Sequence, residues 1–107
     1  MSIRALREAV EAGDIDKLPD NIFRRAFRGY PTAGIGFNTS EAFEGSLDAA
    51  KALHEAVLPG WWWIVGSDGK AFVGKAGRYE TGAYQDSSPA RAWLLAVLKA
   101  LEDQENV

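Results

Sequence analysis

The chain has 107 residues and a formal net charge of −3 at pH 7, and 47% of its residues are hydrophobic. This length fits one domain, and the apolar content supports a packed core and argues against disorder. With no cysteine and a single histidine, the sequence excludes disulfides, and we expect no metal site and no cofactor. No apolar run is long enough to span a bilayer, so we expect a cytoplasmic protein that is not bound to membranes.

The first 45 residues predict two helices followed by an irregular segment. Ile3, Leu6 and Val10 recur at helical spacing until Gly13 ends the first helix. A second helix can begin at residues 19–20 and carry apolar side chains, Phe27 among them, toward the core. Several glycines and small polar residues follow. They predict a loop or an irregular edge strand over residues 32–45.

The second part of the chain carries a stronger pattern. Ser46 is a suitable N-cap for a helix whose predicted apolar face runs from Leu47 to Leu58. Three strands are predicted next, at residues 61–65, 70–73 and 77–84, with a hairpin turn at 67–69. Ser88 and Pro89 then open the last helix. The predicted fold class is α+β: a single domain with a three-stranded antiparallel sheet packed with helices, in which two N-terminal helices precede an α-β-β-β-α core at 46–101.

Three short strings within this core resemble those of the phage ABA sandwich family, a group of small α-β-α domains from tailed phages and prophages. The strings are Ser46-Leu47-Asp48-Ala49-Ala50, Leu58-Pro59-Gly60-Trp61, and Ser88-Pro89-Ala90 at the start of an Ala- and Leu-rich helix. The resemblance covers residues 46–101. It implies this fold and a phage or prophage setting, and it supplies no catalytic residue and no cofactor.

Two features invite a chemical interpretation, and both are better explained by structure. His54 lies at the margin of its helix's apolar face, and no sequence signature supplies the orienting partner or nucleophile that a catalytic histidine needs. Residues 69–76 have the spacing of a phosphate-binding loop, but Ala76 replaces the required hydroxyl and the intervening residues indicate a strand. We therefore expect no catalytic residues and a protein that is not an enzyme.

Aromatic residues point to binding instead. Successive side chains of a strand point to opposite faces, so Trp61 and Trp63 share one face, and Trp62 and Ile64 occupy the other. Either helices cover both faces, or one face is partly open and binds a partner, because tryptophan is frequent in binding hot spots. Leu95 and a row of alanines on the last helix point away from its core face. This second surface would suit a homodimer or a docked partner.

Charged residues support two partner classes. Exposed acids could occupy a nucleic-acid-binding groove on a host protein. The candidate acids are Glu41, Glu44, Asp48, Glu102, Asp103 and Glu105. Alternatively, the predicted second helix interleaves aromatic residues with Arg24, Arg25 and Arg28, a pattern that suits contact with nucleic acid, although its aromatics are also explained as core.

The sequence as a whole predicts a non-enzymatic phage or prophage protein that acts by protein–protein binding in the cytoplasm of a bacterial host. An inhibitor of a host defence complex, of the anti-CRISPR kind, is one class that fits a small acidic chain. Two alternatives are a nucleic-acid-associated phage regulator that uses Arg24, Arg25 and Arg28, and a virion accessory protein.

Overall fold

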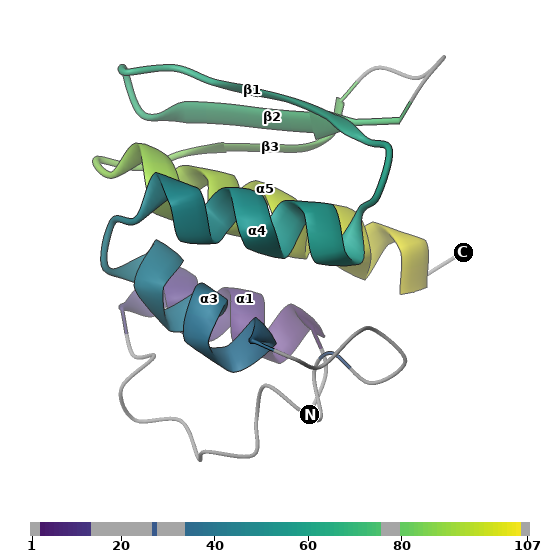
Figure 1. Cartoon of the computed structure of the whole chain (residues 1–107), viewed down its shortest axis with the longest axis horizontal. Helices are drawn as coiled ribbons and strands as arrows, with labels where there is room; N and C mark the ends of the chain where they lie inside the picture. Colours follow the sequence, from purple (N-terminus) through teal and green to yellow (C-terminus); the bar gives the residue numbers. More distant parts are fainter. Residues whose placement is uncertain (1–2, 14–26, 28–33, 76–79, 106–107) are drawn as a thin grey trace.

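The computed structural model describes residues 3–13, 27, 34–75 and 80–105. These residues form four helices and one antiparallel sheet, which confirms the predicted α+β class. The elements are α1 (Ile3–Ala12), α3 (Ile35–Phe43), α4 (Leu47–Val57), β1 (Trp62–Val65), β2 (Lys70–Gly74), β3 (Glu80–Gln85) and α5 (Pro89–Glu105). Figure 1 shows three layers, with the sheet on one side, α4 and α5 in the middle, and α1 and α3 on the other side.

Helix α1 belongs to the core of the domain. Its apolar stripe of Ile3, Leu6 and Val10 is buried, as predicted, and Gly13 follows it in the left-handed conformation. The other predicted N-terminal helix lies outside the described residues, apart from Phe27, which is fully buried as expected. The described N-terminal residues therefore complete the core of the domain.

Helix α3 corrects the prediction of a loop or edge strand over residues 32–45. Gly34 precedes it with a φ of 77°, and Thr39, Ala42 and Phe43 are buried at helical spacing. Glycines and small polar residues give this segment little helix propensity of its own. Packing against α4 and α5 stabilises the helix, because tertiary burial can override a weak intrinsic preference.

Helix α4 begins as predicted, since the Ser46 hydroxyl accepts a hydrogen bond of 3.1 Å from the backbone N–H of Ala49. Leu53 and Val57 are buried on its core face. The expectation for Leu47 is wrong, because this side chain is 48% exposed. It is the first residue of the helix, at the end of the packed face, where neighbouring elements no longer cover it.

The sheet has the order β1-β2-β3, and both neighbouring pairs are antiparallel. The predicted hairpin turn joins β1 to β2, and Gly69 occupies its left-handed position with a φ of 84°. β2 occupies most of the stretch with phosphate-loop spacing, which agrees with the structural interpretation of that stretch. Of the third predicted strand, residues 80–84 lie in β3, and residues 77–79 lie outside the described part of the chain.

Helix α5 is the central helix of the domain. Ser88 caps it, because its hydroxyl accepts a hydrogen bond of 3.3 Å from the backbone N–H of Arg91. α5 contacts β2 and β3 on one side and α1 and α3 on the other (Figure 1). Leu95 is therefore only 2% exposed, and its expected role as a surface contact is wrong. The row of alanines beside it is buried for the same reason.

Candidate functional site: the open edge of strand β1

Trp63 lies where β1 meets the two helices of the middle layer. Its ring stacks on Trp93 of α5 with a centroid separation of 5.4 Å and an interplanar angle of 27°. It also meets the ring of His54 from α4 edge to face, at 5.0 Å. In spite of these contacts, 38% of Trp63 remains exposed. The result is a large aromatic side chain that is held rigidly and still reaches solvent.

His54 fixes this aromatic cluster through both of its ring nitrogens. The indole N–H of Trp93 lies 3.2 Å from His54 Nδ1, and an indole nitrogen can only donate, so Nδ1 accepts. The ring proton is then on Nε2, which donates to the Trp61 carbonyl oxygen at 3.1 Å. Burial of the ring lowers the pKa of His54 below its ordinary value, although the bond to Trp61 opposes the shift. His54 is thus a buried, neutral link between α4, α5 and the start of β1.

Among the described residues, the backbone of β1 is paired on one side only, with β2. The Gly66 N–H donates to the Lys70 carbonyl at 2.9 Å, which places the hydrogen-bonded pairs of the β1–β2 ladder at even-numbered β1 residues. The N–H and C=O groups of the odd-numbered Trp63 and Val65 therefore point toward the open edge of the sheet. No hydrogen bond to these four groups is found within the described residues. They form a short template for another strand.

The preceding residue on the same edge is already satisfied within the domain. The Trp61 N–H donates to the Leu58 carbonyl at 3.1 Å, and the Trp61 carbonyl accepts from His54. Trp61 itself is half-buried against the core. The open part of the edge is therefore limited to Trp63 and Val65.

The outer face of the sheet carries the other set of alternating side chains. Ile64 is 60% exposed, and it lies opposite the half-buried Phe72 of β2. Trp62 lies over Gly74, where any Cβ atom would collide with the indole ring. None of the described helices covers this face (Figure 1). We refer to Trp62, Trp63, Ile64 and the outward backbone groups of Trp63 and Val65 as the β1 patch.

The ammonium group of Lys51 lies beside the β1 patch. The Lys51 ammonium group is 6.0 Å from the centroid of the Trp63 ring. Lys51 also forms a long ion pair of 3.8 Å with Glu55, one turn further along α4, and both side chains are more than half exposed. An exposed pair of this kind contributes little stability, so Lys51 can take another partner at small cost.

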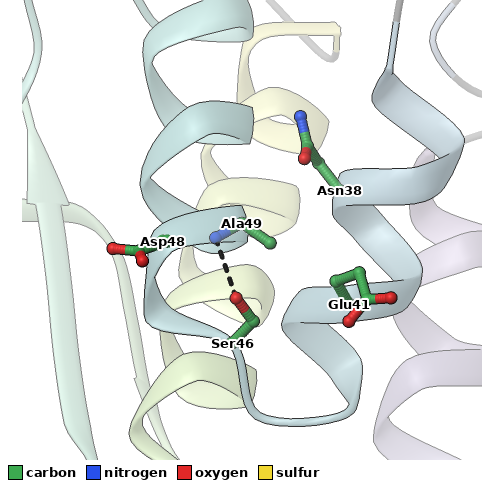
Figure 2. A pocket seen from close by; sticks show the side chains of 5 residues that line it. All are labelled: Asn38, Glu41, Ser46, Asp48 and Ala49. Atoms are coloured by element: carbon green, nitrogen blue, oxygen red, sulfur yellow. Dashed lines mark hydrogen bonds between the residues drawn. The ribbon is translucent and has the colours of Figure 1, made fainter.

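The predicted acids are divided by the structure. Glu41, Glu44 and Asp48 are exposed around the junction of α3 and α4, and we call these three residues the acidic corner. Two of them line a shallow depression of about 320 Å³ together with Asn38, Ser46 and Ala49. In Figure 2 the carboxylates of Glu41 and Asp48 point away from each other. Their arrangement does not form the close pair that acid–base chemistry requires.

Glu102 corrects the predicted acidic surface, because it is buried and paired. Arg7 Nε donates to Glu102 Oε2 at 2.5 Å, and Arg7 Nη1 donates to Glu11 Oε1 at 2.8 Å. The Tyr84 hydroxyl donates to the same Glu11 oxygen at 2.6 Å. The hydrogen bond from Arg7 lowers the pKa of Glu102, and burial with the bond to Glu11 raises the pKa of Tyr84 to about 12. This network satisfies its own charges and ties α1 to α5 and β3.

Asp103, another predicted acid, is partly exposed and forms an ion pair of 3.3 Å with Lys99, one turn earlier on α5. The other predicted sites have no described geometry. Arg24, Arg25 and Arg28 lie outside the described residues, as does the side chain of Glu105. Within the described part, no three acidic or histidine side chains gather as metal ligands would. None of the described helices has the length and apolar character needed to cross a membrane.

Comparisons with protein-family models, with curated proteins and with solved structures each found no match to this chain. The resemblance to the phage ABA sandwich family therefore stays a prediction. Sequence reasoning named the three tryptophans and placed Ile64 on the strand face of Trp62, but it missed Lys51 as part of the same surface. Strand alternation is enough to place Ile64, whereas the position of Lys51 depends on how α4 packs below β1.

Proposed function

We propose that the chain is a non-enzymatic phage protein that binds a protein of its bacterial host through the β1 patch. The observation that carries this proposal is the exposure of Trp63 and Ile64 on an edge strand whose outward backbone groups are unpaired. Stacking on Trp93 already fixes Trp63. A rigid aromatic anchor loses little conformational entropy on binding, which favours its use in an interface.

The acidic corner supports a more specific form of the proposal. Glu41, Glu44 and Asp48 give the α3–α4 junction a negative surface, and the chain carries a net charge of −3. A host complex that binds nucleic acid presents a positive groove, which such a surface complements. A defence complex of the CRISPR–Cas type is therefore the target class that we propose.

The test is photo-crosslinking in the bacterium that carries the gene. A benzophenone amino acid replaces Ile64 in one variant and the exposed Glu8 of α1 in the control. After irradiation, lysates are treated with nuclease and adducts are identified by mass spectrometry. We expect a discrete protein adduct at Ile64 that survives nuclease and is absent at Glu8. Equal labelling at both positions would contradict the proposal.

A second set of variants tests the acidic form. Reversal of Glu41, Glu44 and Asp48 to lysine should abolish the adduct at Ile64 while leaving the melting temperature close to that of the parent protein. An unchanged adduct would reject the proposal that the target is a defence complex, while the proposal that the β1 patch binds a host protein would stand. An adduct at Ile64 that nuclease digests would be an adduct to nucleic acid, and it would instead favour the nucleic-acid alternative, which depends on Arg24, Arg25 and Arg28.

A further inference from the structure

We infer that the partner contributes an extended strand that pairs antiparallel with β1, with an apolar residue opposite Ile64 and an acidic residue opposite Trp63, beside Lys51. This inference rests on the proposed function, because it specifies how the β1 patch binds. It assigns to the edge a mode of recognition in which main-chain hydrogen bonds provide affinity and alternate side chains provide specificity.

The hydrogen-bonding groups determine the register. Trp63 and Val65 each present one N–H and one C=O group to the open edge, so both form hydrogen-bonded pairs with an added antiparallel strand. Ile64 then lies in the intervening non-hydrogen-bonded pair. Side chains approach each other most closely in such pairs. The most exposed large apolar side chain of the described residues therefore meets its partner residue at the shortest range.

The charge of Lys51 and the alternation of side chains along a strand determine which residue fits opposite Trp63. The partner residue opposite Trp63 points to the inner side of the sheet, the side on which Trp63 packs toward α4 and α5. The Lys51 ammonium group already lies 6.0 Å from that indole ring. A carboxylate at this position can contact Lys51 in place of Glu55, whose ion pair is long and exposed. The edge thus favours an apolar residue followed by an acidic one.

A second copy of the chain fits this edge less well. In the antiparallel register centred on Ile64, the symmetry-related strand would place Val65 opposite Trp63, so that Lys51 would face an apolar side chain. A partner strand with an acidic residue opposite Trp63 can pair with the Lys51 ammonium group, which a homodimer would leave facing Val65.

The experiment uses the full chain labelled with ¹⁵N and a capped hexapeptide of sequence TTVEVT, whose first valine faces Ile64 and whose glutamate faces Trp63. Two singly N-methylated peptides probe the backbone. Methylation at the glutamate, whose N–H points to β1, should weaken binding about tenfold. Methylation at the first valine, whose N–H points away from β1, should change the dissociation constant less than twofold. Chemical shifts of the β1 amides report binding.

A charge exchange probes the acidic position. The peptide TTVKVT should bind the parent protein about threefold more weakly than TTVEVT, in line with the size of exposed ion pairs. Lys51→Glu should reverse that preference. Lys99→Glu, on the exposed side of α5, is the matched control and should leave the preference unchanged.

The outcomes separate this inference from the proposed function. Equal effects of the two N-methyl groups, or no peptide binding, would overturn strand addition even if Ile64 crosslinks a host protein. If methylation at the glutamate weakens binding and methylation at the valine does not, but Ile64 forms no adduct with a host protein, strand addition is supported and the host function is rejected. In a third outcome, the protein binds no peptide and forms a concentration-dependent dimer that Ile64→Lys dissociates. That result would show that a second copy of the chain occupies the edge, and it would overturn the inference.

Discussion

Replacement of His54 by leucine tests the link that holds β1 against the helices. The substitution introduces an apolar side chain of similar size and removes both hydrogen bonds of the ring. The buried Trp93 N–H then lacks an acceptor, which costs about 1–3 kcal/mol, and the loss at the Trp61 carbonyl adds about 1 kcal/mol. We expect a total loss of about 2–4 kcal/mol in the free energy of unfolding. For a domain of this size, this corresponds to a melting temperature lower by roughly 10–20 °C.

The same residue predicts a specific dependence on pH. Burial lowers the pKa of folded His54, so the unfolded chain binds a proton first as the pH falls below about 6.5. Stability should therefore be constant between about pH 7 and pH 8. Below about pH 6.5 it should fall, with a slope that approaches about 1.4 kcal/mol per pH unit. Protonation would also place a proton on Nδ1, against the N–H of Trp93.

Urea denaturation followed by tryptophan fluorescence between pH 5 and 8 measures both effects. His54→Leu should lose the pH dependence between pH 5 and 6.5, because the lowered pKa values of Glu11 and Glu102 place their titration at still lower pH. His54→Gln keeps a donor for the Trp61 carbonyl and serves as a control that lacks only the acceptor for Trp93. A loss below about 0.5 kcal/mol in His54→Leu, or an unchanged pH slope, would refute the reasoning.

Three further substitutions test other parts of the fold by thermal and urea unfolding. Gly74→Ala should destabilise the protein by about 1–3 kcal/mol, because the added methyl group collides with the Trp62 ring, and a neutral effect would mean that the ring lies elsewhere. Ser46→Ala should cost about 1 kcal/mol through loss of the N-cap of α4, and no change would contradict that cap. Arg7→Met should lower the free energy of unfolding by about 3 kcal/mol, because Glu102 stays buried without its main partner. Adding Glu102→Leu should restore most of this loss. A double variant that is equally unstable would contradict the ion-pair explanation.

Local signals in the sequence predicted much of the fold. The caps at Ser46 and Ser88, the stop at Gly13 and the hairpin turn ending at Gly69 each depend on one or two residues and their neighbours, and the structure confirms them. Helix α3 was missed because its stabilisation comes from packing, which its own residues do not indicate.

Burial on both sides of a helix was harder to predict. The sequence pattern predicts that Leu95 points away from the core, but α5 packs between the sheet and the layer of α1 and α3, which buries this side chain (Figure 1). Glu102 was assigned to the surface because the partner that buries it, Arg7, is distant in sequence. The candidate site shows the same limit. Strand alternation separated the faces of Trp62 and Trp63, but the open edge and the approach of Lys51 required the three-dimensional arrangement.

Amide hydrogen exchange of the β1 residues, measured for the protein alone and for its complex with the host protein captured at Ile64, tests the central claim most directly. In the protein alone, the amides of Trp63 and Val65 should exchange rapidly, whereas those of Trp62 and Ile64 should be protected by pairing with β2. In the complex, Trp63 and Val65 should become protected as well. Protection of Trp63 and Val65 in the isolated protein, or no change on binding, would show that the β1 edge is not the binding surface.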